Sequence, residues 1–598
     1  MQKKKEDLFS KSISLYVLLI YFVLSLIITF PLIFHFKDYV IGNQYTDVWQ
    51  NLWSFSRIEK CLLERESPFF AIYRGYPLGG KFYPVELFNA LLSVPLQVIF
   101  NLTIAYNVSV ICLMILGGYG AYCLVAYLTG NRIAGFVSGI IYGFSPCQIS
   151  WLHNGTTQLL SIGWIPLFIL YLLKSLKEKG YTKNLLLAAI FLFLSAFSSW
   201  FLGLAACMFM VLLFLYYLFF KRRTEFNLIN TFKMFLVFLL FVLLISPFAY
   251  LVHDSILGTN DANMIVEKSP DGSLLAIEEA EFSNLIDYFR LIPFGVKSQR
   301  ITRLLKITPF SLSSFYIHGV YIGYLVLFLT LLGYSSKEKR KQAGFWISTA
   351  VFFFILSLGP YLHLSGREPM MISGHKIPLP YLVFFKFVPF FWLMTSPSRF
   401  MIMVFLCLSV VVGFGLSEAL RKLKRGHQHV MSVFISFLIV SEYLVFSPLP
   451  YPLPINSTDV SNYYYKLAKE KGEFAIIEVP IKHWYFSKGK GSYAQSIHGK
   501  RVVYGISGTS SPLPYITKTN SFAKYLAYLE DALPTAVSFS DIDLEHGLNE
   551  LKGYDFRYII VHNNLLNEDS SEDVHQFLKK FLGKPNKYED NIVVYTIR

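Results

Sequence analysis

Long apolar segments recur through the first three quarters of this 598-residue sequence and are absent from the last quarter. Each is close to the ~20 residues that an α-helix needs to cross ~30 Å of hydrocarbon. Only 16% of the residues are charged, too few for an ordinary soluble protein. We expect an all-α polytopic membrane bundle of about 11 helices. The expected spans are residues 14–34, 103–128, 133–149, 159–173, 185–200, 202–220, 232–252, 316–334, 345–362, 399–416 and 430–446.

Basic residues account for the net charge of +15, and many of them lie in short loops between apolar segments. This distribution is typical of cytoplasmic loops and argues against a nucleic-acid-binding surface. It places the N-terminus inside, as an uncleaved signal anchor, and the C-terminus outside the plasma membrane. The long loops 35–102 and 253–315 then lie outside. Trp49, Trp53 and Tyr73 in the first of them suit a membrane interface.

The composition changes after residue 447, where Pro448, Pro450, Pro452 and Pro454 predict a stiff linker. We therefore divide the chain into a transmembrane domain, residues 1–447, and an extracytoplasmic domain, residues 448–598. β-branched and aromatic runs alternate with helical patterns in the second part, which predicts an α/β or α+β fold. The predicted strands are 474–479, 501–504, 558–562 and 592–597, and the predicted helices are 521–533 and 574–582.

An acidic residue in the first outer loop, Asp47, is the first candidate for chemistry, as a general base between aromatic neighbours. The alternative is that Asp47 caps a loop helix that begins at Val48, because Asp is a favoured N-cap residue. The apolar stretch 86–100 is too short for a span whose two flanks both lie outside. We interpret it as an interfacial helix.

Several short motifs carry a family resemblance. They are Phe82-Tyr83-Pro84-Val85-Glu86 before the interfacial helix, Phe144-Ser145-Pro146, Trp164-Ile165-Pro166-Leu167, Ser396-Pro397-Ser398-Arg399-Phe400 and Gln495-Ser496-Ile497-His498-Gly499-Lys500. Together with the loop carboxylate they resemble the GT-C superfamily of membrane glycosyltransferases, and in particular its YfhO-like members. Protein mannosyltransferases and aminoarabinose transferases are more distantly similar.

The resemblance implies transfer of a sugar from a polyprenyl-phosphate donor to a lipid, glycan or protein acceptor at the outer membrane face. Asp47 matches the family's loop carboxylate, which removes a proton from the acceptor hydroxyl. Tyr83 and Glu86 become candidate substrate-binding residues. The sequence departs from the family in two respects: it has no Asp-Glu pair beside Asp47, and it carries Glu86 where related enzymes often have His or Pro.

Other polar residues are expected at the same face. Arg399, where the chain re-enters the membrane, is a candidate for binding the donor phosphate; the alternative is an interfacial arginine that reaches the headgroups. His153 and Asn154 are candidates for substrate contact, although a lone histidine is more often a satisfied polar group. His498 is a candidate for acceptor binding, and an ordinary domain surface explains it nearly as well.

No cofactor is predicted with certainty. A divalent cation is possible at Glu278, Glu279 and Glu281, although such a run is more often a solvated surface. The six cysteines form neither a disulfide framework nor a metal motif. Two alternative functions stay open: a lipid-linked saccharide transporter or flippase, which should carry ionisable residues within several spans, and a non-catalytic membrane scaffold.

Overall fold

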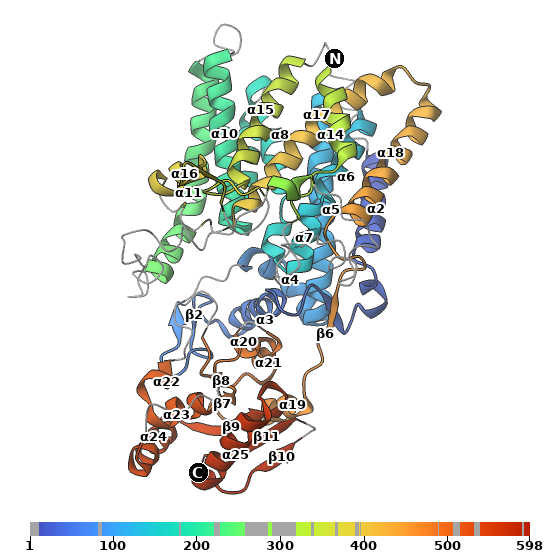
Figure 1. Ribbon diagram of the computed structural model, residues 1–598. Coiled ribbons are helices and arrows are strands. Elements are labelled where there is room, and N and C mark those ends of the chain that lie inside the picture. Colours follow the sequence, from blue (N-terminus) through green and yellow to red (C-terminus); the bar gives the residue numbers. More distant parts are fainter. Residues whose placement is uncertain are drawn as a thin grey trace.

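The computed structural model describes most of the chain as a helical bundle joined to a smaller C-terminal α/β region (Figure 1). The described residues are 11–81, 86–178, 181–220, 228–257, 285–289, 319–335, 340–364, 369–388, 391, 394, 396–487, 489–505, 515–530, 539–588 and 591–597.

Every predicted span contains a helix. The bundle helices are α2 (Lys11–Ile28), α5 (Leu102–Thr129), α6 (Arg132–Gly143), α7 (Pro146–Asn154), α8 (Trp164–Lys177), α9 (Tyr181–Ser198), α10 (Trp200–Phe220), α11 (Leu228–Leu257), α14 (Tyr324–Ser335), α15 (Arg340–Ser357), α17 (Met401–Arg421) and α18 (Arg425–Phe446). Within the described residues, eight helical stretches are long and apolar enough to cross a membrane. The chain is a polytopic helical membrane protein.

Two of the differences between predicted spans and observed helices have a clear physical cause. The helix predicted over 133–149 ends at Gly143, and α7 begins at Pro146, because the Ser145 side chain caps the new helix and proline suits its first position. The helix predicted over 316–334 begins only at Tyr324. There the Glu442 carboxylate of α18 accepts hydrogen bonds from the Tyr324 and Leu325 amides, at 2.6 and 3.1 Å, and so caps the new helix.

Helix α17 forms the centre of the bundle and packs against α6, α14 and α15. It is 94% buried over its most apolar stretch, whereas α11 and α18 are only 22% buried and form the periphery. Glycines bring the backbones together, as at Gly415, where an added Cβ would lie 2.6 Å from the Cα of Gly333 on α14. Close approach at small residues is how membrane helices gain packing energy.

The first long loop contains two helices, α3 (Val48–Glu64) and α4 (Leu87–Ile99), and three short strands, β1 (Tyr39–Ile41), β2 (Phe70–Ala71) and β3 (Gly80–Lys81). Helix α4 agrees with the predicted interfacial helix. One of its faces packs on α3 and α5, while Leu92, Val98 and Ile99 are exposed. Such a one-sided apolar face suits a helix that lies in the membrane surface.

The C-terminal region is a mixed sheet between two layers of helices, as its sequence predicts. The strand order is β10-β11-β9-β7-β8, with β7 parallel to β8 and β9. The strands are β7 (Ala475–Val479), β8 (Arg501–Val502), β9 (Phe556–His562), β10 (Asn586–Tyr588) and β11 (Ile592–Thr596). Helices α22 (Tyr515–Thr519), α23 (Ser521–Leu529), α24 (Asp541–Gly553) and α25 (Glu568–Leu582) cover one face, and α19 (Asn462–Lys469), α20 (Trp484–Ser487) and α21 (Lys490–His498) cover the other.

The first loop and the C-terminal region are joined by backbone hydrogen bonds. Strand β1 pairs antiparallel with β6 (Ile455–Ser457), directly after the proline-rich segment. Residues 73–76 run beside β8: the Tyr76 amide donates to the Val502 carbonyl, and the Val502 amide donates to the Tyr73 carbonyl. The loop thus covers the free edge of β8.

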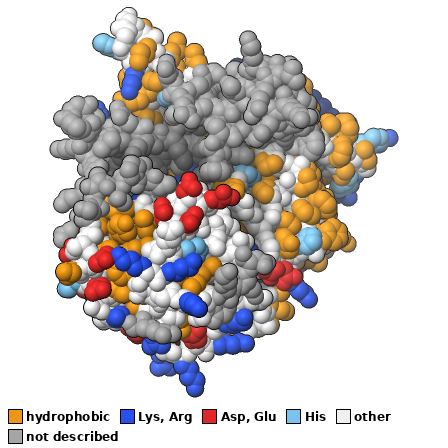
Figure 2. Space-filling view, turned by 60° about the horizontal axis from the view of Figure 1, so that its bottom comes forward, with side chains coloured by type: hydrophobic (Ala, Val, Ile, Leu, Met, Phe, Trp, Pro, Cys, Tyr) orange, Lys and Arg blue, Asp and Glu red, His pale blue; other side chains and the backbone are white. Residues whose placement is uncertain are grey.

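Figure 2 shows basic and acidic side chains interspersed over the C-terminal region, as expected for a surface in water.

Candidate functional site

The site centres on the start of α3, between the bundle and the C-terminal region (Figure 1). Asp47 occupies the N-cap position of α3, but its side chain makes no capping hydrogen bond. Its backbone amide donates to the Asn154 carbonyl at the end of α7, at 3.2 Å. Gly155, with φ +66°, lets α7 end against α3, because a Cβ there would lie 2.7 Å from the Val48 backbone. Packing against α7 therefore fixes where Asp47 stands.

Glu86, immediately before α4, lies within electrostatic range of Asp47. It is 1% exposed, and its carboxylate accepts hydrogen bonds from the Gln158 amide at 2.7 Å and from the Asn89 side chain at 3.1 Å. Asn89 in turn accepts from the Ser161 hydroxyl at 3.2 Å. Glu86 is therefore a buried, hydrogen-bonded carboxyl group close enough to Asp47 for the two charges to interact.

Burial raises the pKa of Glu86 from 4.5 to about 7, and the negative charge of Asp47 adds to this rise. Hydrogen bonds from Thr157, Asn89 and the Gln158 amide oppose it. A carboxyl group whose pKa lies near neutral exchanges protons readily at physiological pH. The two acids thus differ in environment: Asp47 lies at a helix start, and Glu86 is buried among hydrogen-bonding groups.

We predict that Glu86→Gln reduces the pH dependence of stability. Between pH 4.5 and 7 the folded protein keeps a proton on Glu86 that the unfolded chain has lost, so the free energy of unfolding falls as the pH rises through this window. The loss is at most about 3 kcal/mol and is absent in the variant. Apparent melting temperatures in detergent at pH 5 and pH 8 measure it. The exposed Glu64→Gln is the control, and equal slopes for wild type and Glu86→Gln would contradict the assignment.

His153 and Asn154 end α7 and are 3% and 4% exposed. The His153 Nδ1 lies 3.0 Å from the Asn154 side-chain oxygen, and the His153 carbonyl accepts a hydrogen bond from the Asn43 amide at 2.7 Å. The structure therefore brings both residues next to the Asp47 loop, as predicted. These contacts hold the loop, and a contact with substrate stays a prediction.

Arg399 lies in the short 3-10 helix η9 (Pro397–Phe400) that leads into α17. Its side chain is half-buried, between Ser398 and Phe400, which are both buried. Helix η9 packs against α15, while the adjoining α17 also contacts α7, the helix that ends beside Asp47. Arg399 thus belongs to the same part of the bundle, but no described contact joins it to the two carboxyl groups.

His498 lies at the end of α21 and is 3% exposed, inside the C-terminal region. Its ring stacks on Tyr464 with centroids 5.4 Å apart, and its Nδ1 accepts the Lys500 amide at 3.0 Å. Burial lowers the pKa of His498 to about 4, although the nearby Glu478 opposes this effect. The expected position on a domain surface is wrong, because the ring fills the core under α21. A contact between His498 and an acceptor stays a prediction.

Helix α21 instead presents other residues to α3. The Trp53 indole donates to the Gln495 side chain at 2.5 Å, and the rings of Trp49 and Tyr493 lie 5.8 Å apart. The buried guanidinium of Arg74 lies 4.7 Å from the Trp53 ring and donates to the Gly505 carbonyl at 2.9 Å. Trp49 and Trp53 are each 2% exposed, so the prediction that they face a membrane interface is wrong. They anchor the C-terminal region to α3.

Several predicted residues lie outside the described part of the chain, namely Tyr83 and the acidic residues Glu278, Glu279 and Glu281. In the part that the structure describes, no group of three or more His, Cys, Asp or Glu side chains could hold a metal ion.

No protein-family model matches the sequence, and no curated protein matches it either. Solved structures do resemble the fold. Arabinofuranosyltransferase AftD from Mycobacteria is 12% identical with a TM-score of 0.54, covering 98% of this chain and 40% of its own. The chain thus shares the fold of this enzyme over nearly its whole length. The matched region is 40% of the length of AftD, so this chain corresponds to only part of that enzyme.

Two further structures are similar at a lower score. The Archaeoglobus fulgidus oligosaccharyltransferase is 12% identical with a TM-score of 0.48, covering 92% of this chain and 68% of its own. ArnT from Cupriavidus metallidurans, bound to undecaprenyl phosphate, is 12% identical with a TM-score of 0.41, covering 98% of each chain.

Sequence reasoning overlooked the polar face of α4. Asn89, Ser93 and Gln97 recur every four residues in an otherwise apolar helix and are at most 5% exposed. Gln97 donates to the Phe55 carbonyl of α3 at 3.3 Å, and Asn89 holds Glu86. This spacing puts all three on one face, which is the signal that would have identified a buried polar surface beside the site.

Proposed function

We propose that the protein is a membrane glycosyltransferase that moves a sugar from a polyprenyl-phosphate donor to a hydroxyl-bearing acceptor at the outer membrane face. The observation that carries this proposal is the pair of carboxyl groups, Asp47 and Glu86, at the first loop of a GT-C-type fold. The sequence motifs favour the YfhO-like subgroup. The ArnT structure bound to undecaprenyl phosphate is consistent with such a donor, although it resembles this chain only weakly.

In the proposed reaction the acceptor oxygen attacks the anomeric carbon as the bond from that carbon to the phosphate oxygen breaks. Asp47 takes the proton of the acceptor hydroxyl, and polyprenyl phosphate leaves with the electron pair of the broken bond. Asp47 suits this role because packing against the end of α7 holds it at the start of α3. Glu86, buried and hydrogen-bonded, would orient the acceptor and keep the pocket polar.

The donor would lie with its lipid in the membrane and its phosphate near Arg399. A guanidinium binds phosphate oxygens through two parallel hydrogen bonds and stabilises the charge that develops on the leaving group. The buried residues on either side of Arg399 hold η9 in place at the point where α17 enters the bundle.

The direct test is release of lipid phosphate. The purified full-length protein is incubated with a panel of polyprenyl-phosphate sugars, and the free polyprenyl phosphate is measured with and without acceptor glycans or peptides. We expect turnover with at least one donor. A transporter would move the intact donor across vesicles without releasing phosphate, and a scaffold would do neither. Either of these two results with the complete panel would reject the proposal that the protein is a glycosyltransferase.

The proposed orientation puts the C-terminal region and Asp47 on the outer side of the membrane. A cysteine at the 78% exposed Ile542 on α24 should react with an impermeant thiol probe in intact cells. A cysteine at the exposed His427, in the basic turn at the start of α18, should react only after permeabilisation. The wild-type protein controls for its own cysteines. The opposite labelling pattern would reverse the topology. A probe at position 498 would not report on either side, because that residue is buried.

The anchoring of α3 on the C-terminal region predicts that Gln495→Leu slows transfer more than it weakens donor binding. The change removes the hydrogen bond from the Trp53 indole to Gln495 and should loosen the helix that follows Asp47. Loss of a buried hydrogen bond costs about 1–3 kcal/mol. Hydrogen–deuterium exchange should be faster along α3, while the matched exposed variant Gln576→Leu on α25 should exchange as wild type. Unchanged exchange in α3 would refute the anchoring role.

A further inference from the structure

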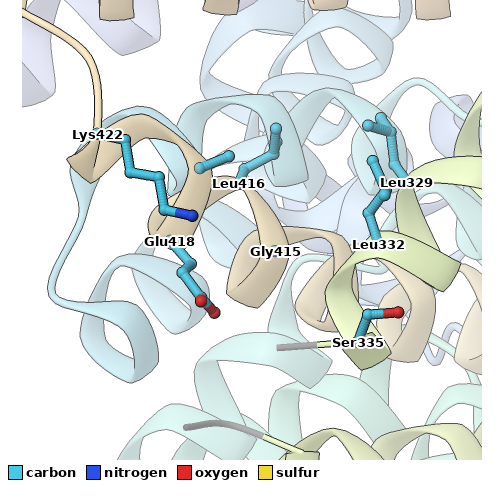
Figure 3. A pocket seen from close by; sticks show the side chains of 8 residues that line it. Leu329, Leu332, Ser335, Gly415, Leu416, Glu418 and Lys422 are labelled. Atoms are coloured by element: carbon cyan, nitrogen blue, oxygen red, sulfur yellow. The ribbon is translucent and has the colours of Figure 1, made fainter. Parts of the chain in front are cut away.

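A groove of about 270 Å³ lies between α14 and α17, at the end of the bundle away from the C-terminal region (Figures 1 and 3). One side carries residues of α14 and the other carries residues from the last turns of α17 (Figure 3). Its lining residues are Leu329, Leu332, Ser335, Gly415, Leu416, Glu418, Ala419 and Lys422. The groove is far along α17 from Arg399, so it is separate from the proposed catalytic site.

The groove lies at the depth of lipid headgroups. The apolar stretch Pro397–Arg421 has 25 residues, which at ~1.5 Å per residue exceeds the ~30 Å of hydrocarbon. Glu418 and Lys422 therefore stand at the membrane surface, next to the basic turn that leads to α18. Leu416 precedes both charged residues on α17 and so lies on the hydrocarbon side of them.

The groove is walled by two helices that approach each other closely at small residues. Gly415 brings α17 close to Gly333 of α14, and Leu329, Leu332 and Leu416 surround the opening. Leu332 is 50% exposed, so the groove is open on its lipid-facing side. The space is therefore an apolar slot with polar groups at its outer end.

The two charged groups of the groove differ in sign and stand one helical turn apart. Oε2 of Glu418 is buried and has no hydrogen-bond partner among the described residues. A buried carboxylate oxygen without a donor is unfavourable, so this atom favours a cationic N–H ligand. Lys422 is exposed and extends from the next turn of α17 (Figure 3). Its ammonium group offers a partner for a phosphate.

We propose that this groove binds an ethanolamine phospholipid. The lipid ammonium would donate to Glu418, the phosphate would face Lys422, and one acyl chain would lie along the leucines. The groove's paired charges complement a zwitterionic headgroup. A choline headgroup has no N–H to donate, and an anionic glycerol headgroup would leave Glu418 without a cation.

Native mass spectrometry of the full-length protein tests this with phosphatidylethanolamine, phosphatidylcholine and phosphatidylglycerol of identical acyl chains. We expect phosphatidylethanolamine to bind about tenfold more tightly than phosphatidylcholine, because one charge-assisted hydrogen bond contributes about this factor in affinity. Glu418→Gln should remove most of that preference. Lys422→Gln should weaken the binding of all three lipids to a similar degree, because each of them carries a phosphate. The exposed Glu545→Gln in the C-terminal region is the matched control and should bind as wild type.

Equal affinity of the wild type for the ethanolamine and choline lipids would overturn the proposal, as would an unchanged preference in Glu418→Gln. A second measurement does not depend on a variant. A photoreactive phosphatidylethanolamine should crosslink wild-type protein within residues 329–335 or 415–422. Crosslinks found only at other sites would also reject the groove as the binding site.

Discussion

Replacing Asp47 with Asn is expected to reduce sugar transfer by about 10²–10⁴-fold, the usual cost of removing a general base. Asparagine has nearly the same shape and is itself a favoured N-cap residue, so α3 should still begin at Val48. Folding and donor binding should therefore change little. The measurement is the initial rate of polyprenyl-phosphate release at saturating donor, with donor affinity determined separately.

The matched control is Asp38→Asn in the same loop. Asp38 is exposed, and its backbone carbonyl accepts hydrogen bonds from the amide and hydroxyl of Thr458. It should transfer sugar at the wild-type rate. If Asp47→Asn is as active as this control, Asp47 is a residue of the helix start and not the base. Because Asp47 makes no capping hydrogen bond, we do not expect that outcome.

Arg399→Ala is expected to weaken donor binding by about 10–100-fold, the range for losing charge-assisted hydrogen bonds to a phosphate. It should also slow the departure of the lipid phosphate, so the rate at saturating donor should fall as well. Lysine at this position should restore only part of the loss, because an ammonium keeps the charge but cannot bind two oxygens through a planar fork.

Equilibrium binding of polyprenyl phosphate, the reaction product, separates this role from a structural one. Arg425→Ala, an exposed arginine at the start of α18, is the control and should bind the lipid phosphate as wild type. Full recovery by Arg399→Lys would indicate that the residue serves only as a positive charge at the membrane surface. Wild-type binding by Arg399→Ala would remove it from the donor site.

The apolar segments were sufficient to predict the helical bundle, since crossing a membrane requires a length of apolar chain that neighbouring residues supply. The same is true of the strands and helices of the C-terminal region, where alternation of side chains is a local property. Helix boundaries were less predictable. The start of α14 depends on Glu442, a residue more than 100 positions away in the chain.

The candidate site required the tertiary structure. Asp47 was identifiable from its loop and its aromatic neighbours, but its distance from Glu86 depends on how α3, α4 and α7 pack. Burial in the packed structure raises the pKa of Glu86, and hydrogen bonds from Asn89 and from Gln158, which follows α7, oppose this rise. His498 illustrates the opposite case, because a motif that suggested a surface residue is buried under α21.

By itself, the sequence determined that this chain spans a membrane, that its last quarter folds as an α/β region, and which loop carries an acidic residue suited to chemistry. The tertiary structure decided that residues 73–76 cover the edge of β8 and that Trp53 is held by Gln495. Periodicity and length depend on near neighbours, whereas these contacts join segments that are hundreds of residues apart. Only packing of the whole chain brings such segments together.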